Sequence, residues 1–177
     1  MSRFVKITVL ACALLAVAGI VQAQNTTTLS VAVGPEAALT VTTGTSTLTA
    51  AGTTFSNDYA GTTSLTYKIR TSKSTGTGTI TLRVTSDFAG TGGPSVATPP
   101  SAGDALTYSG TVSTPGTPAS GAQTASTTAA TAVGSFGAGA NSTKTGNSAT
   151  VDWDLTNDPA YQTGTYTATV TFTISAA

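Results

Sequence analysis

The last fifteen residues constrain the fold more than any other part of this chain. From Thr163 to Ala177 the sequence reads T-G-T-Y-T-A-T-V-T-F-T-I-S-A-A, with threonine alternating against an apolar or aromatic residue from Tyr166 to Ile174. A period of two is the pattern of a β-strand with one buried and one solvated face. The run predicts a long C-terminal strand, and its continuous apolar face favours a central or near-central place in a sheet.

Composition and the other alternating segments predict an all-β protein. Threonine, which is β-branched and favours strands, is the most abundant residue, whereas Glu36 is the only glutamate. Further strands are predicted where alternating segments are separated by turn residues: Thr26–Val33, Ala37–Thr42, Ser64–Thr71, Thr79–Ser86, Leu106–Val112 and Ser148–Leu155. The expected fold is an antiparallel two-sheet β-sandwich of immunoglobulin or pilin type, with long flexible loops.

Three local features refine this expectation. The polar turn Ser72–Gly78 predicts that the strands on either side of it pair as a hairpin. Gly110 predicts an irregularity within its strand. The tracts Gly90–Gly103 and Ser113–Ala130 are rich in Gly, Pro, Ser, Thr and Ala, so we expect them to be mobile surface loops without packed side chains.

The N-terminus has the pattern of a secretory signal peptide, residues 1–23. Arg3 and Lys6 precede an apolar run from Ile7 to Ile20, and Val21-Gln22-Ala23 predicts cleavage before Gln24. The apolar run is too short for a membrane span. The remaining residues, 24–177, are expected to form one secreted domain, in the periplasm or at the surface of a bacterium. Leu10-Ala11-Cys12 leaves lipid attachment as an alternative, although few apolar residues precede the cysteine.

The residue inventory argues against most enzyme classes. The chain contains no histidine, and its only cysteine, Cys12, lies in the signal peptide. Ser-His-Asp and Cys-His machinery, and zinc or copper sites built on these ligands, are therefore excluded. No glycine-rich phosphate-binding loop occurs. Without Arg3 and Lys6, five of the seven basic residues remain against seven acidic ones, a balance that does not suggest nucleic acid. We expect a non-catalytic protein without a cofactor.

One acidic cluster is a candidate metal site. Asp152 and Asp154 lie two residues apart on a predicted strand, so both carboxylates face the same side, and Asn157 and Asp158 follow. These oxygen ligands suit Ca²⁺, and two carboxylates could in principle serve a glycosidase. The simpler interpretation is a solvated outer face beside a turn.

The aromatic residues divide into a core and a surface group. Trp153 shares its face with Val151 and Leu155, which predicts a core position, although a sugar-stacking platform is the alternative. Tyr59 and Tyr161 lie in turn-like segments and are candidates for exposed contacts, for example with a surface polysaccharide.

Four basic residues gather on the predicted hairpin: Lys68, Arg70, Lys73 and Arg83. Charged residues commonly solubilise a sheet and protect its edges from aggregation. The alternative is a docking patch for the acidic Asp152–Asp158 region of a neighbouring copy.

The run Gly164–Ile174, G-T-Y-T-A-T-V-T-F-T-I, and the signal peptide resemble spore coat protein U-like and chaperone–usher-type pilin domains. The resemblance implies a secreted, threonine-rich β-sandwich at the cell surface, of a kind that often assembles by donating an N-terminal strand. This chain departs from the pattern in lacking a cysteine pair after residue 23 and in ending with Ser-Ala-Ala.

Together these features favour a structural or adhesive surface protein, a fimbrial-like subunit of a pilus, coat or matrix. The Thr26–Val33 segment is expected to lie at a sheet edge, where it could complete its own sheet or that of a neighbour. The alternative function is a secreted module that binds a carbohydrate or another ligand.

Overall fold

The computed structural model describes residues 27–177. The chain divides into two compact units, Met1–Ala32 and Val33–Ala177, and the second contains all ten described strands. The predicted signal peptide, its cleavage site and Cys12 lie outside the described residues. Between residues 27 and 177 there is no helix with the length and apolar character needed to cross a membrane.

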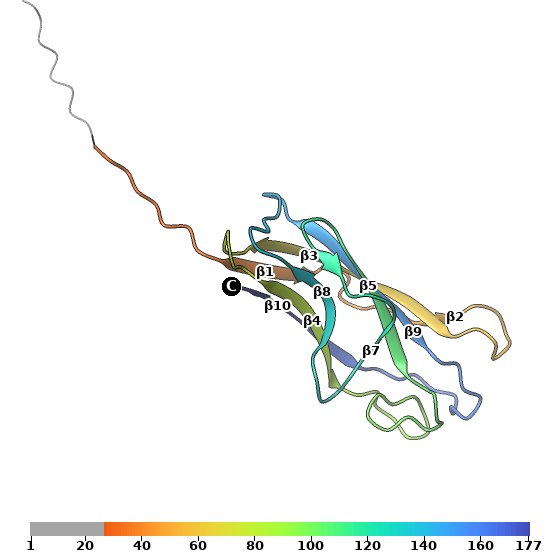
Figure 1. Cartoon of the computed structure of the whole chain (residues 1–177). Helices are drawn as coiled ribbons and strands as arrows, with labels where there is room; N and C mark the ends of the chain where they lie inside the picture. Colours follow the sequence, from red (N-terminus) through yellow and green to blue (C-terminus); the bar gives the residue numbers. More distant parts are fainter. Residues whose placement is uncertain (1–26) are drawn as a thin grey trace, which may run out of the picture. The chain divides into compact units, whose positions relative to one another are not determined.

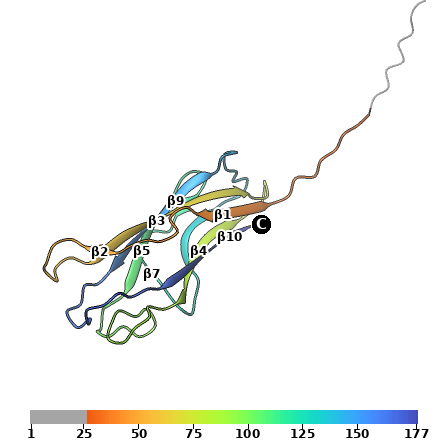
Figure 2. The ribbon, with the colours of Figure 1, turned by 180° about the vertical axis from the view of Figure 1, so that it is seen from behind.

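Two antiparallel sheets form a β-sandwich, which confirms the predicted fold class (Figures 1 and 2). The first sheet has the order β1-β3-β9-β5-β7, with β2 also paired to β3; its strands are β1 (Glu36–Val41), β2 (Thr49–Ala50), β3 (Tyr59–Arg70), β5 (Leu106–Val112), β7 (Gln123–Thr124) and β9 (Asn147–Leu155). The second has the order β10-β4-β8-β6; its strands are β4 (Gly78–Ser86), β6 (Thr117–Pro118), β8 (Thr131–Phe136) and β10 (Thr169–Ala176).

The core lies between the sheets and is built from the inward positions of each alternating strand. Trp153 is only 6% exposed, as its parity predicts. Its ring packs at a tilted angle against Tyr108, with 5.5 Å between ring centroids, and its indole N–H donates to Thr63 Oγ1 at 2.8 Å. The one polar atom of this large side chain is therefore satisfied inside the core.

The predicted hairpin is wrong, because β3 and β4 lie in different sheets. Their apolar rows face each other across the core instead of lying side by side in one sheet. The connecting turn is held at the end of the sandwich by hydrogen bonds from Thr71 N to Ala140 O (2.9 Å) and from Ser72 N to Ala177 O (3.0 Å). Alternation shows which face of a strand is buried, but it does not show which strand lies beside it.

The C-terminal strand is shorter than predicted and lies at the edge of its sheet. Strand β10 begins at Thr169 and pairs only with β4, so the prediction of a central strand from Thr163 is wrong. Tyr166 explains the late start. Its ring packs over the backbone of Gly90 and Gly93, and its hydroxyl donates to Gln162 O at 2.9 Å, which uses this stretch to hold a loop.

The two low-complexity tracts lie mostly at the surface, as predicted, but each contains buried positions, contrary to the prediction that they do not pack. Ser113–Ala130 contains the short strands β6 and β7, and Ala125 is buried. In the tract that starts at Gly90, Gly93 and Pro94 are buried. Pairing of β6 with β8 and of β7 with β5 gives Ser113–Ala130 a path that its composition does not indicate. Gly90–Gly103 is held instead by the Asp87 carboxylate and by a hydrogen bond from Gln162 N to Gly92 O at 2.7 Å.

The Asp87 carboxylate organises the loop after β4. Its oxygens accept hydrogen bonds from Phe88 N (2.8 Å), Val96 N (2.8 Å), Ala97 N (3.0 Å) and Ser95 Oγ (2.7 Å). Partial burial alone would raise the pKa of Asp87, but these hydrogen bonds together lower it below its ordinary value of 3.8.

Replacing this carboxylate should open the loop. We expect Asp87→Ala to lower the free energy of unfolding by about 1–2 kcal/mol, since several donors to a charged acceptor lose their partner. Residues 88–103 should then be cleaved faster in limited proteolysis. Because the folded-state pKa is depressed, the stabilisation is present above pH 3.8 and is lost as the pH falls through the lower folded-state value. Loop cleavage unchanged by both the substitution and acid would contradict this role.

Gly110 does not interrupt its strand, although the sequence predicts an irregularity there. Strand β5 pairs with β9 in continuous register from Leu106 to Val112. The glycine instead permits close approach of the opposite sheet, because a Cβ at this position would lie 2.7 Å from Val133 O.

Adding that methyl group should destabilise the sandwich. We expect Gly110→Ala to cost about 1–3 kcal/mol in urea unfolding, because the overpacked backbone cannot move aside without shifting a strand. Gly137→Ala is the matched control, since a Cβ there meets nothing within 4 Å. Equal free energies of unfolding for the two variants would show that the added methyl group is accommodated between β5 and β8 without destabilising the fold.

Candidate functional site

The candidate site is an open seam between the free edges of the two sheets. Strand β1 is the edge of one sheet, β10 is the edge of the other, and the two strands pack against each other on the same flank. An edge strand presents backbone N–H and C=O groups that have no partner within their own sheet. The seam therefore combines two hydrogen-bonding edges along one side of the sandwich.

The apolar side chains along this seam are incompletely covered. On β10, Val170, Phe172 and Ile174 are only partly buried, whereas Ile80 and Leu82 on the adjacent strand β4 are 0% and 1% exposed. The seam side chains of β1 are also partly buried, namely Ala37 and Leu39. One further strand along the seam would bury these side chains as fully as those of β4 are buried.

The segment before β1 has the pattern of such a strand but no sheet of its own. Residues 27–35 form no strand, and Leu29, Val31 and Val33 are 90%, 85% and 62% exposed. The predicted Thr26–Val33 strand is therefore not present at an edge of this chain's own sheets; Thr26 itself lies outside the described residues. An exposed row of alternating large aliphatic side chains is an unfavourable surface unless a partner covers it.

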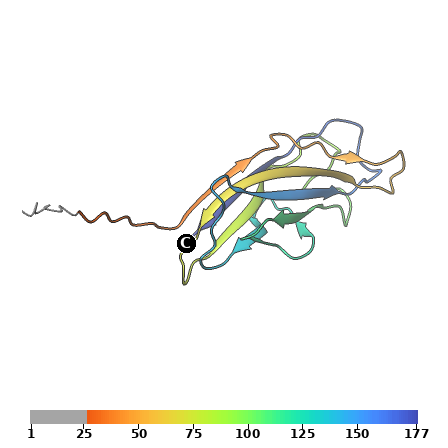
Figure 3. The ribbon, with the colours of Figure 1, turned by 90° about the horizontal axis from the view of Figure 1, so that it is seen from above.

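The two ends of unit 33–177 differ in their parts, and we name them by what they contain. The entry end holds the start of β1, the end of β10, the turn 71–77 and the loop 137–146. The loop end holds residues 51–58, 87–104 and 156–166. Figures 1 and 3 show β1 beginning beside the chain terminus at one end, with these long loops gathered at the other.

Of the predicted acidic site, Asp154, Asn157 and Asp158 lie at or beside the loop end, whereas Asp152 lies within β9, and three of the four make separate local hydrogen bonds. Asp152 accepts from Thr62 Oγ1 at 2.7 Å on the outer face of β9. Asn157 donates its backbone N–H to Asp58 at 3.1 Å, and Asp158 accepts from Ala160 N at 2.7 Å. Within residues 27–177, no three Asp or Glu side chains are placed so that they could hold a metal ion.

The carboxylates at this end nevertheless influence one another. Partial burial raises the pKa of Asp154, and repulsion from Asp58 raises it further. Tyr161 lies beside them and donates its hydroxyl to Asp104 at 3.0 Å; burial first, and then this carboxylate, raises the pKa of Tyr161. Like charges are thus concentrated here at an electrostatic cost.

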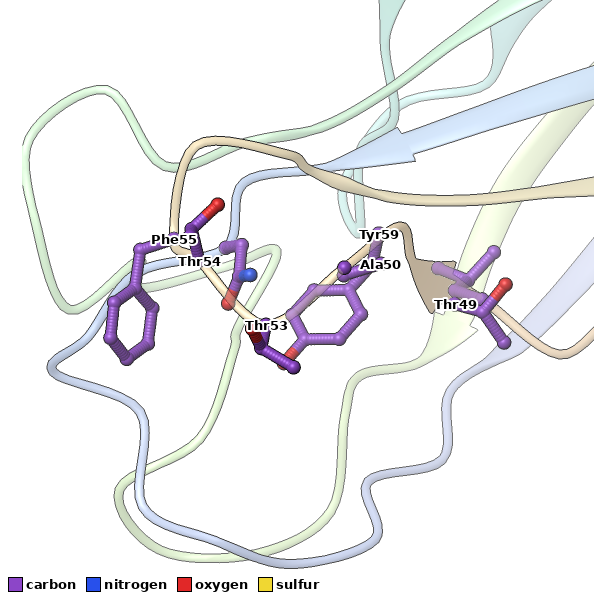
Figure 4. A pocket seen from close by; sticks show the side chains of 9 residues that line it. Thr49, Ala50, Thr53, Thr54, Phe55 and Tyr59 are labelled. Carbon is purple, nitrogen blue, oxygen red and sulfur yellow. The ribbon is translucent and has the colours of Figure 1, made fainter.

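A shallow hollow of about 470 Å³ opens at the same end, lined by residues 48–50 and 52–55 together with Tyr59 and Asn157. Figure 4 shows the rings of Phe55 and Tyr59 along it. Sequence analysis identified Tyr59 but missed Phe55, which is 64% exposed. A lone phenylalanine in a polar loop gives no pattern from which its exposure could be predicted.

No protein-family model, curated protein or solved structure matches this chain. The seam and the exposed N-terminal segment are therefore interpreted from the chain's own residues.

Proposed function

We propose that this protein is a secreted, non-catalytic structural subunit that assembles by strand addition at the cell surface. The N-terminal segment of one copy, residues 26–33, enters the open seam of the next. The observation that carries the proposal is the match between the partly buried apolar side chains on the edge strand β10 and an exposed apolar row with strand periodicity in the same chain. Secretion rests on the predicted signal peptide.

Two physical terms favour the insertion. Complete burial of Leu29, Val31 and Val33 would contribute about 1.5–3 kcal/mol for each side chain. The inserted backbone would also pair with the open edge of β10, the usual source of affinity when a peptide adds to a sheet. Because each copy has both a segment and a seam, the contact is head to tail and grows a fibre instead of closing a dimer.

Electron microscopy of the mature protein tests the proposal. We expect filaments from the unaltered chain and none from a Leu29→Asp, Val31→Asp variant, because burying either carboxylate would cost several kcal/mol. Thr28→Asp with Ser30→Asp is the matched control, since it places the same charges on the other face of the segment. Monodisperse particles at high concentration, or equal filament formation by both variants, would refute strand addition.

The hollow at the loop end favours a second candidate function, binding of a saccharide. Two aromatic rings, Phe55 and Tyr59, lie near the Asn157 amide, and sugars are commonly held by stacking on rings together with hydrogen bonds to polar groups. A glycan array probed with the mature protein, and with Phe55→Ala as a control, would test it. Binding that survives the substitution would place the sugar elsewhere.

A further inference from the structure

Every strand pair of the two sheets is antiparallel, and an inserted strand that follows this pattern has its direction set by β10. Strand β10 runs towards the entry end, so a segment paired antiparallel to it runs towards the loop end. Val33 of the donor would then lie at the loop end of the acceptor. Only Gly34 and Pro35 separate Val33 from β1, so the donor's own entry end would lie directly against the acceptor's loop end. Parallel insertion would instead bring the donor's entry end against the acceptor's entry end, where the acceptor's own chain enters β1.

The entry end is rich in positive charge. Four of the five basic residues in the described part of the chain gather there: Lys68, Arg70, Lys73 and Lys144. The loop that carries Lys144 is fixed to the end of β3 by a hydrogen bond from Ser142 N to Ile69 O at 2.9 Å. Glu36 is the only acidic side chain there and pairs with Arg70 at 2.9 Å. Four cationic side chains against one carboxylate leave this end positive.

The loop end carries the opposite charge. Asp58 and Asp154 are exposed, Asp158 is half-buried, and Asp87 and Asp104 lie in the adjoining loops. Within the described residues this end contains no lysine or arginine; the fifth basic residue, Arg83, lies in the middle of β4. Hydrogen bonds stabilise Asp87 and Asp158, but no cationic side chain of the described residues lies at this end to offset the repulsion between Asp58 and Asp154.

We infer that the two ends are complementary docking faces, so that the basic entry end of one copy contacts the acidic loop end of the next. The inference rests on the strand addition proposed above, which brings these two ends together, and it names a second copy of this chain as the partner. Oppositely charged faces steer association and set its direction, while like faces, entry to entry or loop to loop, repel. The charges therefore oppose wrong-way insertion before any strand is paired.

The test follows assembly of the full mature chain by light scattering. We expect the rate to fall about tenfold or more between roughly 20 mM and roughly 500 mM NaCl, because salt screens steering. Two variants alter the faces. Lys73→Glu with Lys144→Glu reverses exposed charges at the entry end. Asp154→Lys with Asp158→Asn removes negative charge at the loop end, and the asparagine can still accept from Ala160 N.

Combining the variants gives the decisive result. Each pair of substitutions alone should slow assembly. In a chain that already carries Lys73→Glu and Lys144→Glu, however, adding Asp154→Lys and Asp158→Asn should accelerate assembly. Both faces are negative in the first variant, and the added substitutions weaken their repulsion. Arg83→Glu is the control and should leave the rate unchanged, since this residue lies at neither end.

Each alternative outcome separates the two proposals. Filaments whose assembly rate does not change with salt or with any of the charge substitutions would refute the contact between the ends and remain consistent with strand addition. A chain that forms no filaments but associates weakly at low salt, with the same order among the variants, would refute strand addition and retain the contact. A chain that does neither would refute both.

Discussion

A synthetic peptide of residues 26–33 should raise the free energy of unfolding of a chain that begins at Gly34 by about 3 kcal/mol, when present at about 100 times its dissociation constant. The truncated chain retains the whole of β1 to β10, but its seam is empty. Because a ligand that binds only the folded state stabilises it by mass action, the melting temperature should rise by roughly 10 °C for a domain of this size.

The expected gain comes from a specific set of contacts. The peptide would place Leu29, Val31 and Val33 against the partly buried row on β10, which includes Phe172. A peptide with Val31→Asp is the matched control, since it keeps the length and backbone but would bury an unpaired charge. Thermal unfolding followed by circular dichroism measures both. Equal shifts with the two peptides, or no shift with either, would show that the seam does not accept this strand.

Trp153→Ala should be the most destabilising single substitution in the core. We expect a loss of about 3–5 kcal/mol, a large fraction of the stability of a typical domain. Trp153 packs on Tyr108, and its indole N–H is the partner of Thr63 Oγ1, so truncation creates a cavity and removes a buried hydrogen bond. Urea unfolding of the truncated chain without residues 26–33 would measure the loss free of assembly.

Trp153→Phe separates the two contributions. It keeps most of the apolar volume but removes the N–H donor, so it should cost less than the alanine substitution. Native fluorescence gives an independent check, since Trp153 is the only tryptophan in the chain. Red-shifted emission that is easily quenched would place the ring at the surface and return it to consideration as a sugar platform.

The candidate site could be predicted only in part. The alternation in Thr26–Val33 and in the C-terminal run predicts two strands with one apolar face each; residues 27–33 form no strand in the isolated chain, and their exchange between copies stays a prediction. The seam itself was not predictable, because nothing in the alternation of β10 distinguishes an edge strand from a central one. The acidic run near Asp158 and a basic group on the predicted hairpin were both visible in the sequence. Folding removes Arg83 from that group, adds Lys144 and places the basic and acidic groups at opposite ends of the sandwich.

The sequence by itself determined what depends on a single strand: the all-β class, the inward side of each strand and the core position of Trp153. These properties follow from a period of two and from side-chain size, which are local. Only the tertiary structure decided which strands are neighbours, so it placed β3 and β4 in separate sheets, ordered the Ser113–Ala130 tract and left β10 at an edge. Strand pairing joins residues far apart in the chain, and its choice depends on the packing of all strands at once.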